Sequence, residues 1–502
     1  SRVESEELSS LALEGPDGTS VDLLSKGDLQ LRYTTRDGAE GTLPLGGALE
    51  HWFLENPQYI LFDDIVDAED IRTEYARFEK VISTVAPHTF KLASLLHDAL
   101  HRMSVDTALQ DEFFARMDHF CPVEERVNVA LCRRYFETHG PRAFLRLLVT
   151  GRDLRGRYVF APLPNLLFTR DLAAVVGSLV VICSAAKPAR LREMVLSWLV
   201  YTAHPHFAGL AADGKMQVVD MLAARQAHPT PDRVTIEGGD ILHLGGGTLL
   251  IGVGERTTRE GAIELARQIW ADGRQARSGI DRIIVLDILA RRASMHLDTI
   301  FTMVHQDGDE FEAMVYGPYV QEGGYGAISC VVLEPGDFAG GKIPTADSVQ
   351  SIKRRSLGQL FTEIVGWRMR PLFCGGRMER RDRHDASEWA DPAEVFFGAL
   401  PEQRLSKREQ WTDGANLFAL APGIVTTYAR NRRSLEELSA HNFLVVTPED
   451  FVRNSLYYLK RCRGASGNRV VIPLGGSELS RGRGGQRCMT QPLLRARTTR
   501  TS

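Results

Sequence analysis

The sequence has few of the features that mark secreted, membrane or disulfide-rich proteins. It holds only seven cysteines in 502 residues, and no two of them have Cys-x-x-Cys spacing, which argues against a disulfide framework and a structural zinc site of that kind. No segment approaches the ~18 uncharged apolar residues of a membrane-spanning helix, and the opening SRVESEELSS does not resemble a signal peptide. We therefore expect a protein of a reducing compartment, the cytoplasm, with no membrane partner.

A strong charge of either sign is also missing. The chain carries 60 Lys and Arg residues against 64 Asp and Glu, a net charge of −4, so it has no general attraction for nucleic acid or anionic lipid. The six arginines between Arg481 and Ser502 are not interleaved with aromatic residues, and we expect no nucleic-acid partner. The 43% hydrophobic content is that of a globular protein, and the length fits about three domains or one large enzyme fold.

One pattern recurs along the chain: two short apolar segments separated by a glycine-containing turn. It occurs four times, in residues 168–183, 237–254, 296–315 and 414–428. Helical stretches follow three of these hairpins, at residues 189–199, 258–270 and 434–441, and Thr257 with Glu260 forms a capping box for the second. A repeated ββα unit predicts stacked blades or layers rather than one doubly wound sheet.

Polar residues occupy the same place in each repeat, where the first strand of the hairpin begins. They are Asp171, Glu237, Asp240, His296, Asp298 and Asn416. If the repeats surround an axis, these side chains converge at one end of it. Turn or cap roles explain one such residue easily and four such placements less well. Alternation along a strand also predicts that His296 and Asp298 share one face.

The rest of the chain divides by its pattern. Residues 86–151 have helical spacing, with one helix ending and another beginning at Gly140-Pro141. Residues 14–50 and 375–410 lack a clear period and are interpreted as surface excursions. We expect an N-terminal part of the catalytic fold with a divergent insertion at 1–85, a helical insertion at 86–151, and the remainder of the catalytic fold at 152–502.

Cys488 is the candidate nucleophile. It follows a predicted strand at Arg469–Pro473 and a loop rich in glycine and arginine, where we expect nearby cations to favour its thiolate. The other six cysteines are expected to pack as small apolar residues. His296 suits proton transfer, and carboxylates that share its cavity suit a cationic guanidinium. A metal site on His296, Asp298 and Glu237 is a further, less favoured interpretation.

These segments resemble the arginine deiminases of the guanidine-modifying superfamily. The similar stretches are LFDD (61–64), PLPNLLFTRD (162–171), IEGGD (236–240), GVGERT (252–257), MHLDT (295–299), REQWTDGAN (408–416) and GGSELSRGRGGQRCMT (475–490). The resemblance implies an α/β, five-bladed ββα propeller of pseudo-fivefold symmetry, the pentein fold, with an all-helical insertion. It implies hydrolysis of L-arginine to L-citrulline and ammonia, with no cofactor and no metal, and it allows a homo-oligomer.

The resemblance also implies roles for individual residues. Cys488 would form a covalent thiouronium intermediate, with His296 and Glu237 moving protons and with Asp171 and Asp298 binding the guanidinium. The implied substrate-binding residues are Asn165, Phe168, Arg190, Asp240, Arg256, Arg483 and Gly485. The chain departs from many relatives at Gln491, where they have a second cysteine of no catalytic role, and residues 1–60 match poorly, which leaves the first blade uncertain.

Two other functions remain as alternatives. An amidinotransferase of the same superfamily uses a similar Cys, His and acid set but passes the amidino group to an amine. A non-catalytic propeller that binds a partner would lack the nucleophile. The motifs around Cys488, His296 and Glu237 favour the deiminase.

Overall fold

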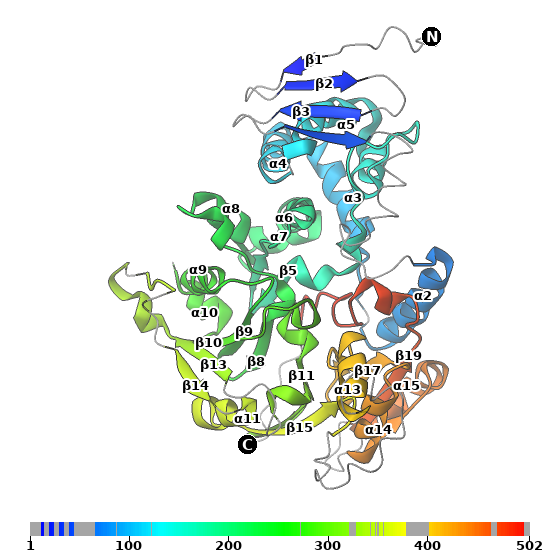
Figure 1. Ribbon diagram of the computed structural model, residues 1–502, viewed down its shortest axis with the longest axis vertical. Helices are drawn as coiled ribbons and strands as arrows, with labels where there is room; N and C mark the ends of the chain where they lie inside the picture. The colour runs from blue at the N-terminus through cyan, green and yellow to red at the C-terminus, as the bar shows by residue number, and fades with distance from the viewer. Residues whose placement is uncertain are drawn as a thin grey trace, which may run out of the picture. The chain divides into compact units, whose positions relative to one another are not determined.

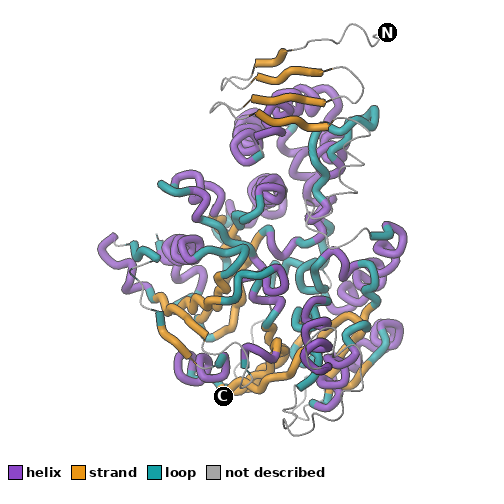
Figure 2. Tube along the Cα trace, in the orientation of Figure 1, coloured by secondary structure: helices purple, strands orange, loops and turns teal. Residues whose placement is uncertain are grey.

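The structure is a computed structural model (Figures 1 and 2). Apart from four N-terminal strands, it describes residues 66–86, 88–121, 123–271, 273–320, 328–341, 343–346, 348, 351–354, 356–377, 401–462 and 469–495. The chain forms two compact units, one of residues 1–65, 90–167 and 187–218, the other of residues 66–89, 168–186 and 219–502.

The first unit is built largely of helices. They are α3 (Leu92–Met103), α4 (Thr107–Phe120), α5 (Val123–Thr150), α6 (Leu191–Ala203) and α7 (Pro205–Ala212). One face of α3 is buried, with apolar residues three and four positions apart, and α3 packs against α5 and α6. As the sequence predicts, α5 breaks at Gly140, which has a φ of 74° and is followed by Pro141. A residue with positive φ ends one helix, and proline suits the first turn of the next.

The first unit also contains a four-stranded antiparallel sheet in the order β1-β2-β3-β4. Its strands are β1 (Ala12–Glu14), β2 (Ser20–Leu24), β3 (Gln30–Thr34) and β4 (Glu40–Pro44). These strands were not predicted from the sequence, in which residues 14–50 are interpreted as a surface excursion. Strands of three to five residues are too short to give a clear two-residue alternation in the sequence.

The other strands form four sheets, and nearly all of these strands lie in the second unit. Their orders are β5-β6-β7, β14-β13-β10-β9-β8, β11-β12-β15 and β16-β17-β19-β18. The strands are β5 (Ala173–Val176), β6 (Leu179–Ile182), β7 (Gln217–Asp220), β8 (Ile241–Gly245), β9 (Thr248–Val253), β10 (Arg282–Asp287), β11 (Phe301–Asp307), β12 (Glu310–Tyr316), β13 (Ile328–Leu333), β14 (Ile352–Arg354), β15 (Arg368–Cys374), β16 (Phe418–Ala421), β17 (Ile424–Tyr428), β18 (Phe443–Val445) and β19 (Arg469–Leu474).

The four hairpins predicted from the sequence are confirmed. They are β5–β6, β8–β9, β11–β12 and β16–β17, all antiparallel. In three of them the second strand also pairs in parallel with a later strand, as β9–β10, β12–β15 and β17–β19. The turn at Gly177 requires glycine, because its φ is +62° and a Cβ would lie 2.3 Å from the Arg277 carbonyl oxygen.

Helices accompany these sheets. They are α2 (Ala68–Val85), α8 (Met221–Ala227), α9 (Arg259–Trp270), α10 (Arg274–Ser278), α11 (Leu357–Leu360), α13 (Pro401–Trp411), α14 (Arg432–Ala440) and α15 (Pro448–Cys462). Helix α9 packs against β9 and β10. Its cap is Thr258, whose side chain accepts from the Gly261 N–H, so the capping box predicted at Thr257 is wrong by one residue.

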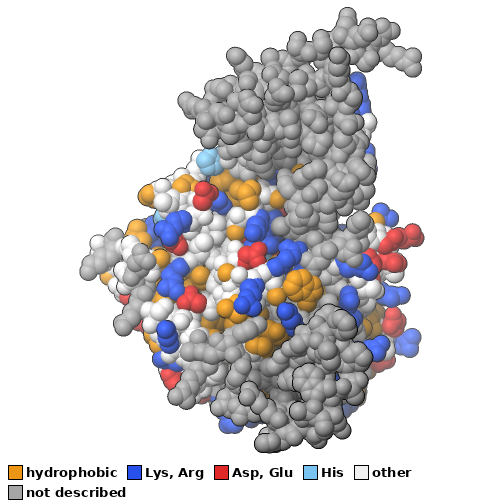
Figure 3. All heavy atoms as spheres, viewed as in Figure 1, with side chains coloured by type: hydrophobic (Ala, Val, Ile, Leu, Met, Phe, Trp, Pro, Cys, Tyr) orange, Lys and Arg blue, Asp and Glu red, His pale blue; other side chains and the backbone are white. Residues whose placement is uncertain are grey.

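The core of the second unit lies between its sheets and helices. Phe311 is central to one aromatic cluster, with ring centroids 4.8 Å from Phe361 and 6.1 Å from Trp367. No helix among the described residues is long and apolar enough to cross a membrane. On the described part of the face in Figure 3, basic and acidic side chains are mixed with apolar ones.

Candidate functional site

Short turns place the polar residues just before the first strands of the hairpins. Asp171 ends the 3₁₀ turn Thr169–Asp171 before β5, and Asp240 ends the turn Gly238–Asp240 before β8. Asp298 lies within the turn Leu297–Thr299 before β11. The prediction that strand alternation aligns His296 and Asp298 is therefore wrong, because these residues precede the strand.

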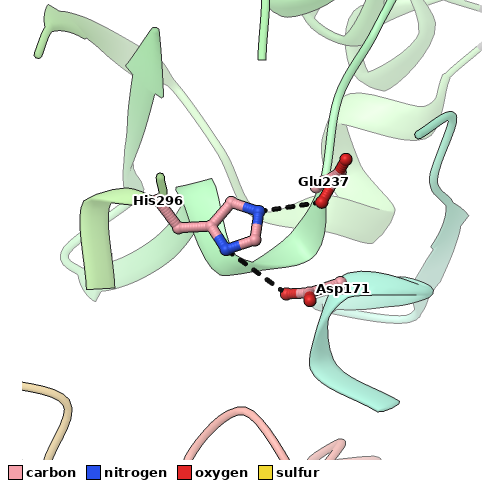
Figure 4. Close-up of side chains that lie close together, drawn as sticks. All are labelled: Asp171, Glu237 and His296. Atoms are coloured by element: carbon pink, nitrogen blue, oxygen red, sulfur yellow. Dashed lines mark hydrogen bonds and ion pairs between the residues drawn. The ribbon is translucent and has the colours of Figure 1, made fainter. Parts of the chain in front are cut away.

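His296 lies between two carboxylates in the second unit (Figure 4). Its Nε2 atom is 2.8 Å from Glu237 Oε2, and its Nδ1 atom is 3.7 Å from Asp171 Oδ1. All three side chains are buried. Burial alone lowers the pKa of His296, but the charge of Asp171 and the hydrogen bond with Glu237 outweigh it and raise the pKa to about 10. His296 is thus a cation at neutral pH.

Glu237 is held on both of its carboxylate oxygens. Oε2 contacts His296, while Oε1 accepts from the Ala186 N–H at 3.1 Å and lies 3.8 Å from Arg256 Nη1. Arg256 is buried and also lies 3.4 Å from Glu255. Two cations therefore flank Glu237, which offsets the desolvation of a buried carboxylate.

Asp240 supports the backbone that carries His296. Its Oδ1 accepts from the Leu297 N–H at 2.8 Å, and its Oδ2 accepts from the Thr257 hydroxyl at 2.6 Å. Burial raises the pKa of Asp240 to about 7, although the charge of His296 opposes this shift. Both of its oxygens are engaged within the protein, so its geometry is that of a residue that orients His296.

Cys488 contacts Asn416 and Asp298. Its Sγ is 3.4 Å from Asn416 Oδ1 and 3.8 Å from Asp298 Oδ2, and the thiol is 5% exposed. Asn416 in turn donates from Nδ2 to the Asp298 carbonyl at 3.1 Å. The Arg170 N–H donates to the Cys488 carbonyl oxygen at 3.0 Å. The nucleophile candidate is thus joined by hydrogen bonds to the turns before β5, β11 and β16.

The electrostatic surroundings of the thiol differ from those expected from the sequence. Burial, followed by the charges of Asp298 and Asp171, raises the pKa of Cys488 well above its ordinary value, and Arg487 only partly opposes this. The prediction that neighbouring arginines favour the thiolate is therefore wrong for the site without a ligand. The Asp298 carboxylate lies 3.8 Å from the sulfur, a contact that the sequence does not indicate.

Asp298 presents an open acceptor. Its Oδ2 forms an ion pair with the Arg487 guanidinium and accepts a hydrogen bond from the Cys488 thiol. Its Oδ1 is buried and has no hydrogen-bond partner within the described part of the chain. A buried carboxylate oxygen without a donor is destabilising, and a cationic ligand would relieve it.

Other predicted site residues pack around the loop of Cys488. Arg483 has a φ of 63°, lies 4.0 Å above the Trp411 ring and donates to the Arg292 and Trp411 carbonyls. The Phe168 ring lies against Gly484, and a Cβ on Gly485 would come within 2.5 Å of Asn416 Oδ1.

Asn165 and Arg190 belong to the first unit. The Arg190 guanidinium pairs with Glu193 at 2.9 Å and reaches the Asn165 carbonyl oxygen at 3.5 Å. Their predicted contact with the α-carboxylate of a substrate stays a prediction.

Sequence reasoning missed three residues of this site. Arg487, Thr257 and Arg170 lie within the quoted motifs and contact Asp298, Asp240 and the Cys488 backbone. The only feature of the sequence that marks them as site residues is their position next to a motif residue. The sequence pattern around Thr257 predicts a helix cap instead.

Ligand atoms of Asp171, Glu237 and His296 lie within 4.8 Å of one another, a spacing that could hold a metal ion. The same carboxylates that raise the pKa of His296 to about 10 would also attract a metal cation, whose binding requires the neutral imidazole. Asp298, which the sequence groups with His296 and Glu237, is not one of these three residues.

The raised pKa of His296 predicts how stability depends on pH. The folded protein holds the proton up to a pKa of about 10, whereas an unfolded histidine releases it near 6.5. This stabilisation is complete below about pH 6.5 and disappears as the pH rises through about 10. Thermal unfolding between pH 6 and 10 should show a steeper loss of stability in the wild type than in His296→Gln. Parallel pH profiles of the two proteins would contradict the assignment.

Comparison with known proteins identifies the family. The family described as arginine deiminase matches residues 58–370 and 399–495. Arginine deiminase of Rhodococcus opacus (strain B4) is 33% identical over 465 residues, which cover 90% of this chain and 93% of the relative. Arginine deiminase of Bacillus cereus (strain B4264) is 29% identical over 487 residues, covering 93% and 97% of the two chains. Because the family match takes in well over half of the sequence, the chain belongs to the arginine deiminase family.

Proposed function

We propose that this protein hydrolyses L-arginine to L-citrulline and ammonia through a covalent intermediate on Cys488. The observation that carries the proposal is the geometry around the sulfur. A buried thiol lies 3.8 Å from an Asp298 carboxylate whose other oxygen has no donor among the described residues. His296 forms its buried ion pair with Glu237 in the same unit, and the chain belongs to the arginine deiminase family.

The substrate guanidinium would bind between Asp171 and Asp298. A guanidinium has five donors in a planar fork, which suits two carboxylates better than an ammonium does. Its positive charge would also lower the pKa of Cys488, which burial and the same carboxylates raise. Substrate binding would thereby release the thiol proton to solvent and form the nucleophile only when arginine is present.

The chemistry then needs one group that alternately gives and takes a proton. The thiolate attacks the guanidinium carbon, and His296, a cation in the resting site, protonates the departing ammonia. Water enters, the neutral imidazole removes its proton, and the oxygen attacks the thiouronium carbon. The carbon–sulfur bond then breaks and the hydroxyl group of the intermediate releases its remaining proton to solvent, which yields citrulline, the thiolate and the imidazolium of His296. Glu237 keeps the imidazole oriented through both steps.

We also propose that Arg256, Arg190 and Asn165 hold the α-amino and α-carboxylate groups, and that Phe168, Arg483 and Gly485 enclose the substrate. Arg256 is supported by its burial beside Glu237. Asp240 would contribute by orienting His296. Retention of the amino-acid end favours hydrolysis over amidino transfer, because the thiouronium stays clamped while water attacks.

For the architecture, we propose a five-bladed ββα propeller with residues 86–151 as a helical insertion. The four hairpins whose preceding turns carry Asp171, Asp240, Asp298 and Asn416 support this arrangement. The proposal extends to the cytoplasm as location, with a homo-oligomer allowed. Citrulline released from arginine by the purified protein, without metal or a second amine, is the basic test of the activity.

Cys488→Ala should abolish citrulline formation. Loss of the covalent step should lower kcat by at least about a thousandfold, measured by colorimetric detection of citrulline. Cys132→Ala, which removes a buried thiol of the helical unit, is the matched control and should keep its activity. A Cys488→Ala protein with more than about a thousandth of the wild-type rate would rule out this nucleophile.

Agmatine, which lacks the α-carboxylate of arginine, should be a poor substrate. Two charge-assisted contacts from arginines are each worth about 1.5–3 kcal/mol, so kcat/KM should fall by at least about a hundredfold relative to arginine. Arg256→Ala should narrow this difference, because it removes one of the two contacts. Equal efficiency with agmatine and arginine in the wild type would disprove the carboxylate assignment.

A further inference from the structure

The loop that carries Cys488 has little regular structure of its own. This nucleophile loop, residues 475–488, follows β19 and contains only the short 3₁₀ turn Leu479–Gly482. Arg483 directly after the turn adopts a φ of 63°, a conformation that L-residues rarely adopt unless their surroundings impose it. Contacts from elsewhere in the fold must therefore hold the loop in place.

Glu74 of α2 supplies one such contact. Its carboxylate accepts from the Ser477 N–H at 2.7 Å, the Leu479 N–H at 2.9 Å and the Glu478 N–H at 3.3 Å. The Ser477 hydroxyl also donates to it at 3.1 Å. Glu74 is 9% exposed, so four donors converge on one buried carboxylate.

The chemistry of this contact is specific to an anion. Successive backbone N–H groups at the start of a turn have no partners within the turn, and they form a concave site for negative charge. An amide in place of the carboxylate would direct its NH₂ group, itself a donor, at some of these N–H groups, which would then lose their acceptor. Helix α2 packs against α15, β16 and β19, so Glu74 projects from a fixed position.

Tyr428, at the end of β17, holds the same loop further along. Its hydroxyl donates to the Gly484 carbonyl oxygen at 2.8 Å. A Cβ on Gly476 would lie 2.0 Å from the Tyr428 ring, so the loop passes directly over this ring before it reaches Arg483. The hydroxyl and the ring of one buried side chain thus contact the loop at two points.

The held segment leads directly to the sulfur. Gly484 lies against the Phe168 ring, and Gly485 lies against Asn416. The Gly485 carbonyl accepts from the Met489 N–H at 3.2 Å, which closes a turn around Cys488. Asn416 Oδ1 also lies 3.4 Å from the sulfur. A shift of Gly484 would therefore change the position of the Cys488 thiol relative to Asn416.

We propose that Glu74, together with Tyr428, is a positioning residue that fixes Cys488 where it can attack the substrate. Glu74 lies more than 400 residues before the loop in sequence and contacts no reacting atom. The inference rests on the proposed function for its kinetic effect but not for its structural effect, which concerns the loop alone.

The test compares kcat, KM and amide hydrogen exchange in Glu74→Gln, Glu74→Asp and Tyr428→Phe. Misplacement of a reacting group by about 1 Å costs up to about a hundredfold in rate, so Glu74→Gln should lower kcat about 10- to 100-fold and leave KM within about threefold. Amides of residues 477–484 should exchange at least about tenfold faster. Glu74→Asp keeps the charge and should restore most of the lost kcat.

Asp153→Asn is the matched control. Asp153 is a buried carboxylate that accepts from the Arg155 and Arg157 N–H groups of another loop. Its loss should lower thermal stability without changing kcat or exchange at 477–484. If Glu74→Gln and Tyr428→Phe change kcat no more than this control does, the positioning role is wrong.

The test also covers a Glu74→Gln variant that does not fold and a wild type that forms no citrulline. If Glu74→Gln does not fold, Tyr428→Phe carries the test, with an expected loss of kcat of about 3- to 10-fold from one missing hydrogen bond. If the wild type forms no citrulline, the proposed function fails, while unchanged exchange at 477–484 in Glu74→Gln would separately overturn the loop anchor.

Discussion

The buried imidazolium of His296 is the interaction on which the rest of the site depends. Three carboxylates, those of Asp171, Glu237 and Asp240, share its buried surroundings, and they could not remain charged together without a cation among them. The ion pair with Glu237 holds the ring, while the Asp240 contact to the Leu297 N–H fixes the backbone. Near Cys488, the charge of Arg487 only partly offsets those of Asp298 and Asp171, which suits a substrate that brings its own positive charge.

The loop of Cys488 places the nucleophile in the site, and residues outside the site hold this loop. Carboxylates near the sulfur disfavour the thiolate, so reactivity depends on a guanidinium arriving and on the sulfur being correctly placed. The first condition follows from Asp298 and Asp171, and the second from contacts such as that of Tyr428 with Gly484. Charge and position are thus controlled by different parts of the second unit.

Local patterns in the sequence predicted the hairpins and the positions of their polar residues, because apolar runs and glycine turns each depend on only a few neighbouring residues. The turn at Gly177 and the break at Gly140 are examples. Properties that depend on burial or on distant contacts were not predictable in this way. The raised pKa of Cys488 reflects burial and the carboxylates of Asp298 and Asp171 in two other turns, and Glu74 contacts its partners across some 400 residues of chain. Thr257 looked like a helix cap because its buried partner Asp240 is 17 residues away.

In the proposed mechanism, water rather than a second amine attacks an intermediate that retains the amino-acid part of arginine. The most direct measurement is mass spectrometry of the products formed from arginine in heavy-oxygen water, with and without glycine. We expect citrulline that carries one heavy oxygen atom and forms at the same rate in both mixtures. Ornithine together with a guanidino derivative of glycine would contradict it and indicate amidino transfer.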